Sequence, residues 1–193
     1  MLNSDDMTLF LTALKFAAVK HSNQRRKDRQ ATPYINHPIE VAEMLWLQGG
    51  VRDRVTLVGA LLHDTLEDTD TTPEEIQNQF GTEVLTLVQE VTDDKSLPKL
   101  ERKEKQIEHA PHQSVRAKQL KLADKICNVY DISHSTPHNW SLKRCQEYLD
   151  WSEQVVAGLR GSNSDLEAYY ETILAQARNV LTQMEKDNKK GSI

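Results

Sequence analysis

The pattern of hydrophobic positions along this chain has the period of a helix rather than that of a strand. Apolar residues recur at spacings of three and four, as between Leu14, Ala17 and Ala18 near the start. This spacing places them on one face of an α-helix. The pattern predicts helices over residues 5–21, 36–48, 54–70, 73–80, 82–91, 99–110, 114–132, 141–159 and 165–184.

Capping residues mark the points where several of these helices start and stop. Thr72 and Glu75 have the spacing of a capping box, and Asp53 stands directly before the third helix. Asn36 is a candidate cap for the second helix. Gly81 is expected to end the helix that begins after Thr72.

Length and composition agree with one helical domain. The chain has 193 residues with only 7 Gly and 6 Pro, whereas residue types that favour helices are abundant. We expect an all-α fold with one domain over residues 1–185, closed by a C-terminal helical hairpin. Residues 186–193 are polar and are expected to form a flexible tail.

Charge and cysteine content exclude several classes of protein. The net charge is -5, which disfavours general affinity for nucleic acid or anionic membranes. Cys127 and Cys145 have neither a CxxC nor a zinc-ribbon spacing. No apolar run approaches the ~20 residues that a membrane helix needs. Because residues 1–6 also lack the apolar core of a signal peptide, a cytoplasmic location is the default expectation.

One stretch concentrates ionisable groups at the end of an apolar run. Val55–Leu62 leads into His63, Asp64, Glu67 and Asp68. Burying such groups is costly unless they are paired or hold a metal ion. Helical spacing would place His63 and Asp64 at the apolar end as ligands, with Glu67 and Asp68 one turn nearer solvent, where a water could be activated. Taken alone, the stretch is also compatible with a helix end followed by a solvated acidic turn.

Two further residues extend this candidate site. His37 stands at a helix start, where an imidazole can project into a cleft or lie on the surface. Asp124 shares a polar helix face with Lys121, Asn128 and Asp131, although it could equally form a salt bridge with a neighbouring lysine. Two imidazoles and two carboxylates suit Mn²⁺, Fe²⁺ or Zn²⁺ better than Mg²⁺.

Positive charge is concentrated in two segments of this acidic chain. Arg25, Arg26 and Lys27 lie in the polar segment 22–36, and residues 99–105 hold four further cations. Arginine suits bidentate or stacked recognition of phosphates and bases. Solvated surface is the competing interpretation of both segments.

Five motifs resemble those of one enzyme family. The spaced His, His-Asp and Asp pattern resembles the HD superfamily of metal-dependent phosphohydrolases. The match is closer to the hydrolase domain of the RelA/SpoT family, and in particular to its small stand-alone members, the metazoan homologues of SpoT. The motifs that carry the resemblance are RRKD (25–28), PYINHP (33–38), LHDTLEDT (62–69), TDDKSLPKLERK (92–103) and KLADKICN (121–128).

This resemblance implies a single HD-domain bundle of about ten helices and a specific activity. Such enzymes remove pyrophosphate from the 3′ position of (p)ppGpp, the stringent-response alarmone, returning GDP or GTP, and they use Mn²⁺. The matching metal ligands are His37, His63, Asp64 and Asp124, and the pair that handles the attacking water matches Glu67 and Asp68. The implied substrate contacts are Arg26, Lys27 and Asn128, with Lys99, Arg144 and Tyr148 as weaker matches.

Several alternatives stay open at this level. The same site could serve NADPH, by removal of its 2′-phosphate, or an adenosine 3′-pyrophosphate, because a metal and a purine contact would serve all three. A nucleotide-binding module without catalysis would be expected to lack part of the ligand set, which is complete here. Synthetase and regulatory regions have no counterpart in these 193 residues, so hydrolysis without synthesis is expected. The sequence does not indicate an oligomeric state.

Overall fold

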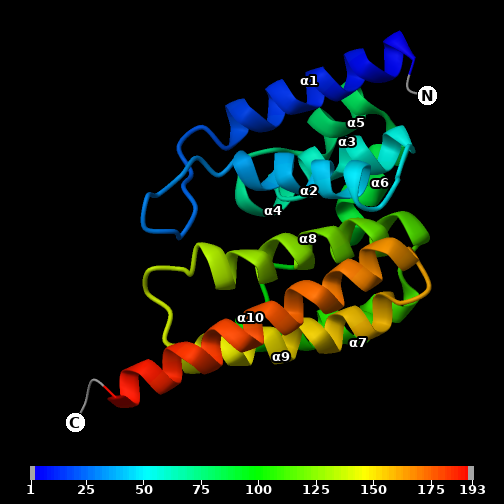
Figure 1. Ribbon diagram of the computed structural model, residues 1–193. Helices are drawn as coiled ribbons and strands as arrows, with labels where there is room; N and C mark the ends of the chain where they lie inside the picture. The colour runs from blue at the N-terminus through cyan, green and yellow to red at the C-terminus, as the bar shows by residue number, and fades with distance from the viewer. Residues whose placement is uncertain (1–2, 191–193) are drawn as a thin grey trace.

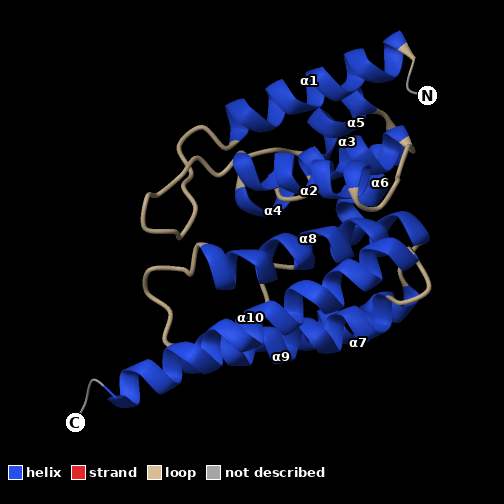
Figure 2. Ribbon diagram, viewed as in Figure 1, coloured by secondary structure: helices blue, strands red, loops and turns tan. Residues whose placement is uncertain are grey.

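The regular secondary structure of the described residues is helical. The computed structural model describes residues 3–190, with side chains to residue 188, and over this range it contains no strand and only an isolated bridge between Arg25 and Pro33 (Figure 2). The all-α prediction is therefore confirmed. The elements are α1 (Ser4–Lys20), α2 (Asn36–Leu47), α3 (Arg54–Leu62), α4 (Thr65–Asp68), α5 (Pro73–Phe80), α6 (Thr82–Val91), α7 (Lys99–His109), the 3₁₀ helix η1 (Ala110–His112), α8 (Val115–His134), α9 (Leu142–Leu159) and α10 (Ser164–Lys190).

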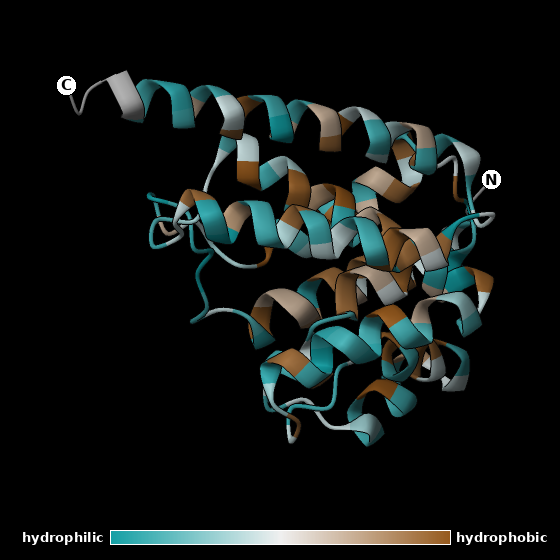
Figure 3. Cartoon of the chain, turned by 90° about the horizontal axis from the view of Figure 1, so that it is seen from below, coloured by the Kyte–Doolittle hydropathy of each residue, from teal (hydrophilic) through white to brown (hydrophobic). Residues whose placement is uncertain are grey.

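Helix α8 lies between two groups of helices (Figure 1). It packs against α2, α3 and α6 on one side and against α9 and α10 on the other. This position requires apolar side chains on more than one face, and Leu120, Leu122 and Ile126 are all fully buried. Coloured by hydropathy, α10 alternates hydrophobic and hydrophilic residues along its length, as expected for a helix with one packed face (Figure 3).

Helix α3 is the most completely buried element near the site. Every residue from Val55 to Leu62 is buried, and the Asp53 side chain caps the helix by accepting the Thr56 N–H at 2.9 Å. A Cβ at Gly59 would lie 2.6 Å from Leu87 Cδ2, so glycine permits α6 to pack closely here. The buried C-terminal end of α3 therefore positions the residues that follow it, His63 and Asp64.

The structure confirms some expected helix ends and corrects others. The capping box of Thr72 and Glu75 is present. Asn36 is the first residue of α2 rather than its cap, and the helix has no side-chain cap. The segment 54–70 is two helices, because α3 ends at Leu62 and α4 begins at Thr65.

The C-terminal helix is longer than the hydrophobic pattern predicted. Helix α10 continues to Lys190, so residues 186–190 are helical where a flexible tail was expected, and residues 191–193 lie outside the described range. Among the described residues no helix combines the length and the apolar character needed to cross a membrane.

Candidate active site

Four residues from three parts of the fold meet at one buried point. His37 lies in the first turn of α2, His63 and Asp64 lie at the junction of α3 and α4, and Asp124 lies on α8. His37 Nε2 is 3.0 Å from Asp124 Oδ1, and His63 Nε2 is 3.1 Å from Asp64 Oδ2. The two crossed His–Asp distances are both 4.0 Å. The predicted ligand set is thus brought together.

The arrangement of hydrogen bonds at His63 fits a cation. Its Nδ1 lies 2.8 Å from the Ala60 carbonyl oxygen, which requires a proton on Nδ1 in the neutral ring. The Nε2 lone pair then faces the Asp64 carboxylate, and Nε2 has no hydrogen-bond partner in the described part of the chain. A lone pair opposite a carboxylate is repulsive unless a positive charge lies between them. Without a metal, a proton on Nε2 supplies that charge, because, although burial opposes the charged ring, Asp64 raises the pKa of His63 to about 9. A divalent metal held by both groups would take the place of this proton.

A second layer of side chains orients the two carboxylates. The Tyr34 hydroxyl donates to Asp64 Oδ2 at 2.6 Å, and Asn128 Nδ2 donates to Asp124 Oδ1 at 2.6 Å. Lys125 Nζ lies 3.0 Å from Asp124 Oδ2, so it is Lys125 and not Lys121 that pairs with this carboxylate. Burial opposes the ionised form of Asp124, but Lys125 and His37 hold its pKa well below the usual range.

Glu67 and Asp68 lie just outside the cluster, on α4. Their side chains are 19% and 32% exposed. Glu67 Oε2 accepts the Asp93 N–H at 3.2 Å, while Lys95 forms an ion pair with Asp68. Burial raises the pKa of Glu67, with Asp93, Asp64 and Asp68 adding to the effect. A carboxylate with a raised pKa at the edge of this cluster of histidines and aspartates is suited to accept a proton.

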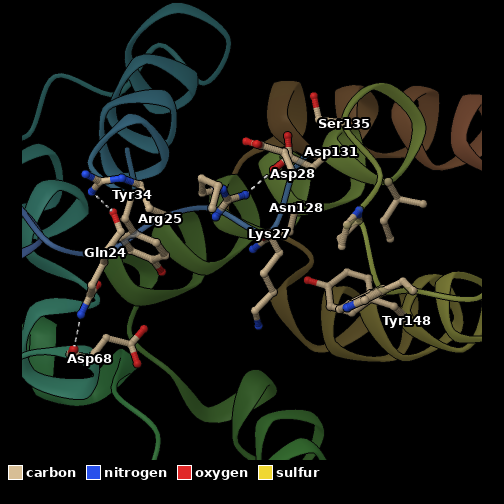
Figure 4. A pocket seen from close by; sticks show the side chains of 14 residues that line it. Gln24, Arg25, Lys27, Asp28, Tyr34, Asp68, Asn128, Asp131, Ser135 and Tyr148 are labelled. Atoms are coloured by element: carbon tan, nitrogen blue, oxygen red, sulfur yellow. Dashed lines mark hydrogen bonds and ion pairs between the residues drawn. The ribbon is translucent and has the colours of Figure 1, made fainter. Parts of the chain in front are cut away.

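A cavity of about 520 Å³ opens beside this cluster, between the loop after α1 and the loop after α8 (Figure 4). Arg26, Lys27 and Asn128 line it, together with Tyr148. The Lys27 side chain projects into its centre (Figure 4). The two loops are joined by a hydrogen bond from the His138 N–H to the Lys27 carbonyl oxygen at 2.8 Å.

A second cavity, of about 640 Å³, continues from the first. Lys27 and Tyr148 line both, and Lys99 and Arg144 line the second. All six expected substrate contacts therefore border one of the two cavities. The first has Arg26 paired with Asp131 near the Tyr34 ring, and the second is rich in cations and aromatic rings.

Sequence reasoning assigned no role to three residues of this region. Tyr34 was part of a quoted motif, but its bond to Asp64 joins positions that are 30 residues apart. Trp140 lines both cavities, and the central guanidinium carbon of Arg144 lies 4.4 Å from the centroid of the Trp140 ring. Lys95 reaches the α4 carboxylates from the loop before α7. For Trp140, the presence of a tryptophan in a polar loop was a local signal that could have indicated a role in the site.

Comparison with known proteins identifies the family. A model of the HD domain matches residues 13–150. A Xenopus tropicalis protein named guanosine-3′,5′-bis(diphosphate) 3′-pyrophosphohydrolase MESH1 is 57% identical over 164 residues, which cover 85% of this chain and 92% of the relative. The chain belongs to the MESH1 family of HD-domain proteins. The MESH1 relative from Homo sapiens is 55% identical over 166 residues, covering 86% of this chain and 93% of the relative.

A solved structure supports the same MESH1 assignment. It is described as a metazoan ortholog of SpoT that hydrolyses ppGpp and plays a role in starvation responses. It superposes with a TM-score of 0.86 at 46% identity, and the match covers 91% of this chain and 97% of the solved one. The predicted HD-domain bundle is thereby confirmed. The cluster of His37, His63 and Asp124 corresponds to the divalent-metal site that an HD hydrolase domain implies.

Proposed function

We propose that this protein is a metal-dependent hydrolase that removes pyrophosphate from the 3′ position of (p)ppGpp, leaving GDP or GTP. The observation that carries the proposal is the cluster of His37, His63, Asp64 and Asp124, which lies beside two cavities lined with cations. The MESH1 relatives are named for this activity, and this chain aligns with more than nine-tenths of the length of each.

Mn²⁺ is the proposed metal, held by His37, His63, Asp64 and Asp124. When bound, such an ion neutralises phosphate charge and lowers the pKa of a bound water. The protein supplies the remaining functions. Glu67 accepts the proton of the attacking water, and Asp68, held by Lys95, orients that water.

The two cavities divide the substrate between them. Arg26, Lys27 and Asn128 contact the nucleoside end in the first cavity, where the Arg26 guanidinium offers a planar surface for a purine. Lys99, Arg144 and Tyr148 contact phosphate groups in the second. The acidic net charge of the whole chain does not oppose this, because the positive field is local.

Product analysis of the purified protein with ppGpp and Mn²⁺ tests the proposal. We expect GDP and pyrophosphate in equal amounts, with no turnover after chelation and full recovery when Mn²⁺ is restored. A parallel incubation with ATP and GDP should form no ppGpp. Turnover that persists in chelator, or the absence of GDP with metal present, would contradict the proposal.

The second cavity favours one further substrate for comparison. Trp140, Tyr148 and Trp151 line it beside the cations, so it offers rings as well as charge. A dinucleotide such as NADPH has a second ring system that could occupy such a space. Release of phosphate from NADPH but no product from ppGpp would assign the same site to 2′-phosphate removal.

A further inference from the structure

The guanidinium of Arg102 lies between Glu67 and the second cavity. Arg102 projects from α7, and its Nη1 is 3.6 Å from Glu67 Oε1. The side chain is only 25% exposed, and it borders the 640 Å³ cavity. This side chain therefore reaches both the proposed base and the proposed phosphate end of the site.

Apart from its 3.6 Å ion pair with Glu67, the guanidinium of Arg102 is not bonded to the described part of the chain. Arg102 Nε is buried without a hydrogen-bond partner, and the side chain forms no hydrogen bond with any residue in the described range 3–190. Other arginines differ. Arg116 donates to Asp53 and Glu83, and Arg178 pairs with Asp150 and Glu153. Leaving buried donors unpaired is costly, and such groups often serve a ligand.

The surroundings of Arg102 carry an excess of positive charge. Lys27, Lys99, Lys103 and Arg144 line the same cavity. Burial lowers the pKa of Lys99, and the neighbouring charges of Arg144, Lys27 and Arg102 lower it further. Cations that repel one another around a cavity create a field that attracts a polyanion.

We propose that Arg102 binds the phosphate groups of the substrate and the released pyrophosphate, exchanging its loose contact with Glu67 for hydrogen bonds to phosphate oxygens. The planar guanidinium can bind phosphate through two parallel hydrogen bonds, which a lysine cannot do. Its positive charge stabilises the charge that develops on the leaving pyrophosphate. The inference rests on the proposed function, because it names the contact of one residue within that same site.

Binding of manganese–pyrophosphate to the Mn²⁺-loaded protein tests this role without requiring turnover. Isothermal titration at fixed free Mn²⁺ compares the wild type with Arg102→Gln and Arg102→Lys. We expect Arg102→Gln to weaken binding by roughly 10- to 100-fold, as for the loss of charged hydrogen bonds. The affinity of Arg102→Lys should lie between those of the wild type and Arg102→Gln, because lysine keeps the positive charge but not the two parallel hydrogen bonds.

Lys105→Gln is the matched control, since it removes one positive charge from the same helix outside the 640 Å³ cavity. It should bind manganese–pyrophosphate as the wild type does, and circular dichroism should show equal helix content in all variants. Equal affinity of Arg102→Gln and wild type would overturn the proposal. So would equal weakening by Lys105→Gln. Weaker pyrophosphate binding by Arg102→Gln than by the wild type, together with no hydrolysis of ppGpp by the wild type, would support the contact and reject the proposed function.

Discussion

Two carboxylates three positions apart in the sequence, Asp64 and Glu67, have pKa values that are shifted in opposite directions. The side chain of Asp64 is 18% exposed, and although partial burial opposes its ionised form, His63 and His37 beside it hold its pKa below the usual range. Glu67 has no imidazole among the groups that shift its pKa, and burial raises that pKa. This divergence suits one group to be a permanently ionised ligand and the other to exchange a proton.

Glu67→Gln is expected to remove turnover while binding persists. The amide cannot accept a proton from water, so kcat should fall by about 10²- to 10⁴-fold, measured with ppGpp and Mn²⁺. In the wild type, a base acts only when ionised, and a raised pKa delays ionisation as pH rises. The acid limb of kcat/KM should therefore show an apparent pKa above 4.5, the ordinary value.

Calorimetry supplies the binding half of that test. Glu67→Gln should retain Mn²⁺ and nucleotide affinity, because Glu67 is outside the four-residue cluster. Glu74→Gln is the control, since Glu74 is an exposed residue in the first turn of α5. Unchanged turnover in Glu67→Gln would reject Glu67 as the base, whereas an acid limb at 4.5 or below would contradict only its raised pKa.

At the scale of elements, helix ends decide where the chemistry is placed. The chain breaks between α3 and α4, and there Asp64 lies 4.0 Å from His37 of α2 and His63 lies 4.0 Å from Asp124 of α8. The start of α3 is held by Asp53, which caps Thr56 and also pairs with Arg116 of α8. Asp53 therefore fixes the helix that leads to the ligands, without contacting them.

Asp53→Ala should lower stability by about 1–2 kcal/mol, the usual effect of losing a helix cap. Urea unfolding of the chelated protein measures the change. Asp53→Asn retains a side-chain acceptor for the cap but loses the ion pair with Arg116, so its stability should fall by less than that of Asp53→Ala. Since neither change touches the site, kcat for ppGpp well below the unfolding temperature should stay near the wild-type value. A stable Asp53→Ala variant would show that packing alone holds α3.

At the scale of the whole molecule, the candidate metal ligands come from helices in both halves of the chain. His37 and Asp124 are 87 residues apart and come from α2 and α8. A metal held by both ligands binds the folded chain and not the unfolded one. Its binding energy therefore adds to the stability of the entire bundle.

Mn²⁺ at about 100 times its dissociation constant should raise the free energy of unfolding by about 2.7 kcal/mol. For a domain of this size this corresponds to an increase in Tm of roughly 5–10 °C, measurable by scanning calorimetry. Chelation should reverse the shift. His37→Gln, which removes one ligand, should show little response to Mn²⁺. An equal shift in that variant would place the metal elsewhere.

Local rules determined much of this protein from sequence. Hydrophobic spacing located the helices, and the caps at Asp53 and Thr72 were predictable because a cap bonds to an N–H only three residues away. The LHDTLEDT and KLADKICN motifs marked the residues that the structure brings together. The stop at Leu62 was not predicted, since the apolar run into polar residues has the same period with or without a break.

Only the tertiary structure decided which distant groups meet. That Tyr34 donates to Asp64 and that Arg102 reaches Glu67 both depend on how α7 and the loops pack against α4. Sequence spacing determines the face of a helix that carries a side chain. It does not determine the partner of that face, because the packing of whole helices sets that choice through many small, non-local contacts.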